Sequence, residues 1–125
     1  MHKYIIVAGI LIIVLAMVPV VPAEKATELY IPIGKSPGLS GKSTAEGHIE
    51  QVDYQKNTLT MSSGSHSYPV KVTEGTKIFL DRSKLGKPNQ YGSFEDCKKG
   101  MMIEVRFEKD EFGQPADWIK LEMSQ

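Results

Sequence analysis

The sequence predicts an all-β fold, a small Greek-key barrel of five to six strands with one short helical turn in the connector before the last two strands. From residue 46 onward, short segments of alternating apolar and polar residues follow one another, and turn residues separate them. Beyond residue 23 the chain has 102 residues, which is enough for one domain with a stable core. No segment repeats at a fixed period.

Four strands are predicted in the first half of this domain. A hairpin joins the first two, and the turn Ser62-Ser63-Gly64-Ser65 joins the second to the third. Pro69 falls within the third strand and cannot donate to a ladder, so this strand lies at an edge or carries a bulge. The predicted strands are residues 48–54, 58–62, 68–72 and 76–81.

The second half begins with the connector, residues 82–100, which Gly and Pro residues interrupt. Within it, Ser93-Phe94-Glu95-Asp96 predicts a short capped helical turn, because acids suit a helix start and serine can cap one. The last two strands follow, at residues 101–109 and 116–123, with a hairpin loop between them. Ala116 is out of phase with the inward positions after it, which predicts a bulge near Asp117-Trp118. This outline is that of a partly open OB-type barrel.

The first 23 residues have the layout of a secretory signal. Lys3 precedes an apolar run at residues 4–21, and Val21-Pro22-Ala23 offers small residues for cleavage. The run is also at the lower limit of the ~17–25 residues that cross a bilayer, so an uncleaved membrane anchor is the alternative. The predicted organisation is a signal peptide at 1–23, an extended Gly/Pro/Ser-rich arm at 24–45 and an OB-like barrel at 46–125, exported to the periplasm or the extracellular space.

Charge and cysteine content narrow the possible partners. Lys3 is the only charged residue of the signal, so the remainder carries 14 basic and 15 acidic residues. This near-neutral balance argues against nucleic acid as a partner, since polyanions are held mainly by clustered positive charge. A single cysteine, Cys97, cannot form an internal disulfide, and it is either buried or intermolecular.

Five motifs carry a family resemblance. They are Gly47-x-Ile49-x-x-Val52-Asp53, Asn57-Thr58-Leu59-Thr60-Met61, Val70-x-Val72-x-x-x-Thr76-x-Ile78, Asp96-x-x-x-Gly100-x-x-Ile103-Glu104-Val105 and the ending Ala116-x-x-Ile119. Over residues 46–123 the chain resembles exported bacterial OB-like small β-barrel domains of unknown function. It is more distantly similar to the CusF-type periplasmic copper chaperones, which bind Cu(I) through methionine, histidine and a tryptophan cap. Their signature, a tryptophan followed by two methionines spaced by one residue on the third strand, is absent here.

Aromatic residues opposite the expected core form the candidate partner site. Trp118 points outward if Ile119 points inward, while Tyr91 lies in the connector and Tyr30 in the arm. Exposed aromatics mark protein or sugar contacts, and the alternative for Trp118 is a lid over the barrel end or cover from the arm. We therefore predict a non-catalytic binding or accessory domain without a cofactor, which presents a barrel face to an envelope protein or another ligand. It has no membrane contact unless the signal is retained as an anchor.

A soft-metal chaperone or sensor is the alternative function. Met61, His66 and His48 are its candidate ligands, with Met101 or Met102 as further members, because thioether and imidazole ligands suit Cu(I). The competing interpretation of Met61 is a flexible core filler. An enzyme is not expected, because no spacing in the chain indicates a nucleophile, a base and an orienting group together.

Overall fold

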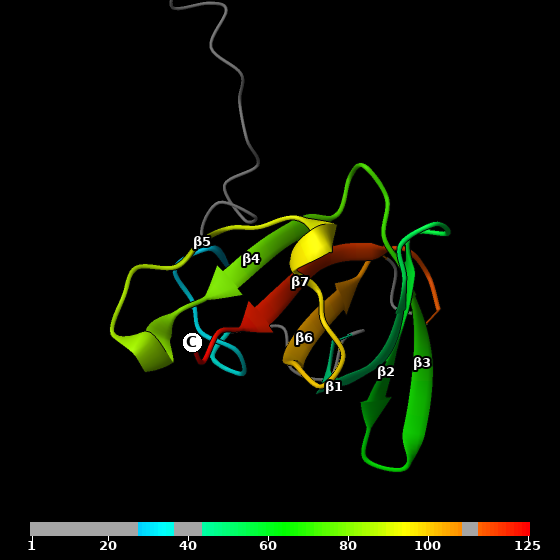
Figure 1. The fold of residues 1–125 in the computed structure, drawn as a ribbon, viewed down its shortest axis with the longest axis horizontal. Coiled ribbons are helices and arrows are strands. Elements are labelled where there is room, and N and C mark those ends of the chain that lie inside the picture. The colour runs from blue at the N-terminus through cyan, green and yellow to red at the C-terminus, as the bar shows by residue number, and fades with distance from the viewer. Residues whose placement is uncertain (1–27, 37–43, 109–112) are drawn as a thin grey trace, which may run out of the picture.

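The computed structural model describes residues 28–36, 44–108 and 113–125 (Figure 1). The predicted signal and half of the predicted arm lie outside the described residues. The strands are β1 (Thr44–Asp53), β2 (Thr58–Ser63), β3 (His66–Lys71), β4 (Lys77–Asp81), β5 (Gln90–Tyr91), β6 (Met102–Phe107) and β7 (Ala116–Glu122). They form one mixed sheet in the order β3-β2-β1-β6-β7-β4-β5, which is not closed. The all-β prediction is confirmed, and in the described part no helix has the length and apolarity of a membrane span.

The connector differs most from its prediction. Where one helical turn was expected, it holds two 3-10 turns, η1 (Ser83–Leu85) and η2 (Phe94–Asp96), with the two-residue strand β5 between them. Strand β5 pairs with the last residues of β4 and brings the number of strands to seven, where five to six were predicted. A pair of strand residues within a Gly- and Pro-rich stretch has too little alternation to be predicted from sequence. The carboxylate of Asp96 caps η2 by accepting a bond of 2.8 Å from the Ser93 amide.

Strand β1 begins at Thr44, four residues before its predicted start and within the predicted arm. Ala45 is buried against β6, where it pairs with Val105. The residues that would indicate this part of the strand in the sequence are small. At Gly47, an added Cβ would lie 1.7 Å from the carbonyl oxygen of Ser62. The close approach of β2 therefore requires glycine here and removes the apolar signal.

Two irregular strand features were predicted correctly. Strand β3 is the edge strand of the sheet, which accommodates Pro69. In β7, Ala116 pairs with Phe107 and Trp118 pairs with Arg106, so Asp117 is the extra residue of a bulge. The bulge returns both Ala116 and Ile119 to the core, as the phase argument required.

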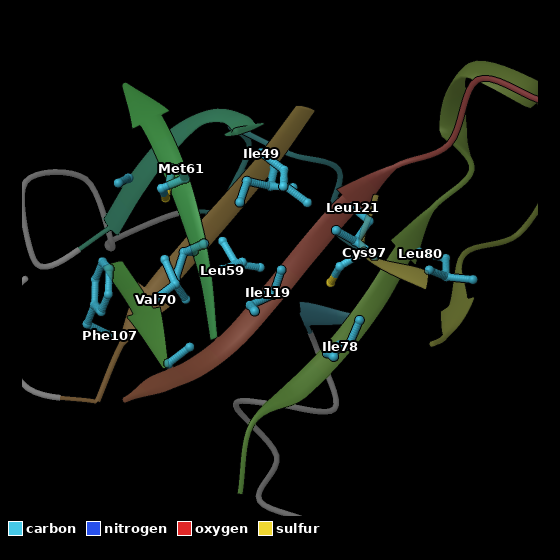
Figure 2. Packing of buried hydrophobic residues seen from close by; sticks show 14 residues of the cluster. Ile49, Leu59, Met61, Val70, Ile78, Leu80, Cys97, Phe107, Ile119 and Leu121 are labelled. Carbon is cyan, nitrogen blue, oxygen red and sulfur yellow. The ribbon is translucent and has the colours of Figure 1, made fainter. Parts of the chain in front are cut away.

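The core lies on one face of this sheet, which we call the inner face. Figure 2 shows its side chains projecting from several strands toward one another. Its fully buried members include Leu59 and Met61 of β2, Val105 of β6 and Ile119 of β7. Cys97 belongs to the same cluster, and burial together with the charge of Asp96 raises the pKa of its thiol to about 12 despite the nearby Lys98. The thiol therefore stays protonated and acts as a small apolar group.

Candidate functional site

The opposite face of the sheet, which we call the outer face, carries charged and aromatic side chains that are nevertheless buried. Strand pairing places Glu46 beside Glu104, Glu104 beside Lys120, and Lys120 beside Phe79, across β1, β6, β7 and β4. Trp118 lies two residues before Lys120 on β7. Phe79, Glu104, Trp118 and Lys120 are each no more than 4% exposed, although none of them belongs to the core cluster.

A separate segment, residues 28–36, lies on the outer face and is drawn in cyan beside β4 in Figure 1. We call it the strap. Lys120 binds both of its ends: the ammonium nitrogen lies 2.7 Å from Glu28 Oε2 and 2.9 Å from Ser36 Oγ. The Ser36 hydroxyl in turn donates to Glu28 Oε2 at 2.7 Å. One buried lysine thus closes the strap into a loop of nine residues.

The middle of the strap is held by two carboxylates from different strands. The amide of Ile33 donates to Asp81 Oδ2 at 2.9 Å, and the next amide, that of Gly34, donates to the Glu104 carboxylate. Gly34 has a φ of +80°, and an added Cβ would lie 2.7 Å from Glu46 Oε1. The positive φ favours glycine where the strap turns against β1 and β6, whereas the Glu46 side chain is exposed and could move aside.

Asp81 and Glu104 respond to this environment in opposite ways. Burial by itself would raise the pKa of Asp81, but hydrogen bonds from Ser83 and the Ile33 amide, together with Lys120, hold it below the usual range. Burial raises the pKa of Glu104, and Glu46 and Glu28 add to the effect, which outweighs the Gly34 amide and Lys120. Glu104 Oε1 lies 3.9 Å from the Lys120 ammonium and has no hydrogen-bond partner among the described residues. Glu104 is therefore the least satisfied charge of the face.

Trp118 was predicted to be exposed, and this is wrong: its exposed fraction is 2%. It does face away from the core, but Lys120 extends over it with the ammonium 4.6 Å from the ring centre, and Glu28 of the strap binds that ammonium. The alternative predicted from sequence, cover from the arm, holds only indirectly, because Lys120 contacts the ring and the arm residue Glu28 binds Lys120. Tyr30, on the strap, is 77% exposed, and Tyr91, whose ring centre lies 5.6 Å from that of Phe79, is 51% exposed.

The candidate metal ligands lie apart. Met61 is fully buried in the core, whereas His66 is exposed at the start of β3. His48 pairs with Ser62, the neighbour of Met61, and so lies on the other face of the sheet from Met61. No group of three His, Cys, Asp or Glu residues suited to a metal ion occurs within the described residues.

His48 instead borders a hollow of about 480 Å³ at the end of β6 and β7. Three methionines line the same hollow: Met101, Met102 and Met123. Met102 pairs directly with His48 across β1 and β6, and the sulfur of Met101 accepts a hydrogen bond from the Lys98 amide at 3.2 Å. Lys98, Lys99 and Glu122 also line the hollow, so its rim is charged.

The sequence interpretation missed the residues that organise the outer face. Glu28, Ser36, Glu104 and Lys120 each stand at a position where strand alternation or loop composition predicts solvent exposure. One signal was available: the apolar stretch Leu29–Ile33 in an otherwise polar arm needs a surface to cover. Nothing in the spacing could pair Glu28 with Lys120, because 92 residues separate them.

No protein-family model matches the chain, and no curated protein matches it. Among solved structures, the chain is similar to one described as the crystal structure of Ag(I)CusF, at 15% sequence identity and a TM-score of 0.44. The match covers 62% of this chain and 93% of that one. At these values it is a distant likeness of fold alone.

Proposed function

We propose that this chain is a non-catalytic binding or accessory domain of the periplasm or cell envelope, exported by residues 1–23 and built on an OB-like Greek-key barrel. The barrel is supported by the β1-β2-β3 meander and by the parallel pairing of β4 with β7. Strands β3 and β4 are consecutive in the chain, and Lys71 at the end of β3 bridges Pro115 just before β7. This contact between the edge strand β3 and the segment before β7 indicates that the sheet curls back on itself, which supports a partly open barrel.

The observation that carries the proposed function is the organisation of the outer face. Strands β6, β7 and β4 present buried charges and aromatic rings there, and a nine-residue strap binds the charged groups. Two exposed tyrosines accompany this face, Tyr30 on the strap and Tyr91 beside Phe79. Tyrosine combines a large apolar ring with a hydroxyl and is enriched where proteins meet partners.

A double substitution tests this function. Tyr30→Ser with Tyr91→Ser removes both exposed rings, and we expect it to abolish retention of an envelope component by the immobilised protein. Tyr54→Ser is the control at a distant tyrosine, which is 46% exposed, packs on Phe94 near η2 and donates its hydroxyl to the Cys97 carbonyl. Thermal melting verifies that both variants fold. Retention that survives the double substitution would contradict a partner site here.

A second candidate function, soft-metal binding, rests on the hollow that gathers His48 with Met101, Met102 and Met123. One imidazole and three thioethers are a donor set suited to Cu(I) or Ag(I). Titration of the purified protein with Cu(I) under reducing conditions, followed by measurement of bound metal, tests it. We expect one equivalent for the wild type and a loss with Met102→Leu, whereas Met61→Leu in the core should bind as the wild type does.

A further inference from the structure

We propose that the outer face around Lys120 is a binding site for a glutamate-bearing peptide segment of a partner protein, and that the strap is the chain's own competitor for that site. The inference rests on the proposed binding function and names its ligand class. Lys120 would bind the carboxylate of the incoming segment in the place that Glu28 now holds. Displacing the strap would free the Lys120 ammonium, which lies 4.6 Å from the centre of the Trp118 ring.

The first step of the argument is how the strap is buried. A segment that merely extends a core buries its aliphatic side chains and leaves its charges in water. In the strap the order is inverted: Glu28 is 5% exposed, whereas Leu29, Ile31 and Ile33 are only partly buried. A carboxylate is thus the anchor of this segment, as it is for a peptide ligand recognised through one charged side chain.

The second step is that three polar groups of the outer face bind the strap, in addition to the contact between Lys120 and Glu104 and the bonds from Ser83 to Asp81. Asp81 accepts the Ile33 amide, Glu104 accepts the Gly34 amide, and Lys120 binds Glu28. Two of these three bonds use backbone amides of the strap, which any peptide could supply. Only the carboxylate is demanded by sequence, and the positive φ at the turn favours a glycine.

The third step concerns what the face lacks without an occupant. Lys120 is 1% exposed, and its contact with Glu104 is 3.9 Å, too long for a hydrogen bond. A buried ammonium without a close carboxylate is strongly unfavourable, so the site requires an acidic occupant. The strap is tethered to the domain, so its effective concentration at the Lys120 site is about millimolar. A partner peptide must therefore bind more tightly than the strap does, or bind when the strap has left the site.

Peptide binding to a variant with a weakened strap tests the proposal. In Glu28→Gln with Ser36→Ala, both contacts of the strap with Lys120 are impaired, while every residue of the sheet is unchanged. The probe is a fluorescent peptide with the sequence of residues 28–36, titrated with purified protein and followed by anisotropy. We expect the variant to bind at least tenfold more tightly than the wild type, and a peptide with glutamine in place of its glutamate to bind at least tenfold more weakly.

Two further variants locate the binding. Adding Lys120→Met to the weakened strap should abolish peptide binding, while adding Lys84→Met, which removes an exposed lysine that pairs with Glu122, should leave it unchanged. The glutamine peptide keeps the test decisive even if the Lys120 variant does not fold.

Equal affinity of wild type and strap variant, or of the two peptides, would overturn the proposal. So would concentration-dependent dimers of the strap variant, because the occupant would then be a second copy. If the peptide fails to bind while an envelope component is still retained through Tyr30 and Tyr91, only this inference falls. If the peptide binds and no envelope component is retained, the proposed function falls instead.

Discussion

Ile119 and Lys120 are neighbours on β7 and are buried to the same degree, at 0% and 1% exposure, but by different means. Ile119 faces the inner side, where strands of the same sheet supply its apolar surroundings. Lys120 faces the outer side, where its cover depends on Glu28 and Ser36 of the strap. The first kind of burial cannot be undone without unfolding the domain. The second can be undone by moving one short segment.

This difference predicts two kinds of stability in one small domain. Opening the inner face exposes the whole core and should cost the full free energy of unfolding. Opening the outer face breaks a few polar bonds and exposes a limited apolar area, so it should occur locally and more often. Burial alone therefore does not distinguish a structural residue from one that a partner could reach.

The largest effect is expected from Lys120→Met. Methionine keeps the length of the side chain but leaves Glu28 and Glu104 buried without their cation, and breaking a buried pair in this way costs about 3–5 kcal/mol. Chemical denaturation at pH 7 measures the loss of unfolding free energy. The loss should shrink as the pH is lowered, because burial already raises the pKa of Glu104 and its protonation removes one of the stranded charges. A loss that does not change with pH would mean that the stranded carboxylates are not its source.

Ile119→Ala is the inner-face counterpart. Truncation of a fully buried isoleucine costs about 2–5 kcal/mol through lost burial and the cavity left behind. No charge is involved, so the loss should be the same at pH 7 and pH 5. Hydrogen exchange should rise throughout the β1, β6 and β7 amides rather than at the strap. A local effect confined to the strap would contradict the assignment of Ile119 to the core.

Gly34→Ala should weaken the strap by about 1–2 kcal/mol, because its positive φ is unfavourable for a residue with Cβ and that Cβ would meet Glu46. Gly64→Ala is the control, since Gly64 has a similar φ of +62° with open space around it. Both variants carry the backbone cost, but only the first should accelerate hydrogen exchange at the Ile33 and Gly34 amides. Equal exchange in the two variants would show that the strap tolerates a side chain at its turn.

The inner face was predictable from sequence because its signal is local. Alternation along residues 101–109 and 116–123 places Ile103, Val105, Ile119 and Leu121 on one side of their strands, and all four belong to the core. The phase error at Ala116 predicted the bulge. Each of these inferences compares residues within one strand. The start of β1 failed for the same reason, since Ala45 and Gly47 are too small to register as an apolar face.

The outer face was not predictable, because alternation assigns every second residue of a half-buried strand to water. Lys120 and Glu104 fit that pattern. Their burial involves contacts with the strap, which is distant from them in the sequence. The apolar character of residues 29–33 indicated that the arm needs a surface, but not which one. Proline at position 32 also made a regular strand there unfavourable, so no ladder pairing could be inferred.

The smallest effect, and the one of opposite sign, is expected from Glu104→Gln. The raised pKa of Glu104 means that the folded state disfavours its charge relative to water, so a neutral isostere should stabilise the protein at pH 7 by about 1 kcal/mol, the lower end of the cost of an unsatisfied buried group. The wild type should gain stability as the pH falls from 7, since the folded state binds the proton of Glu104 before the unfolded state does. The gain is complete below 4.5, the pKa of this group in the unfolded state. The advantage of glutamine should therefore disappear over this window.

The same titration of Glu50→Gln, which replaces an exposed carboxylate on β1 that contacts Ser67, provides the control. If glutamine at position 104 destabilises the protein at every pH, then the charge of Glu104 supports Lys120 more than its burial costs, and the two carboxylates Glu28 and Glu104 act together as the counter-ion of the outer face.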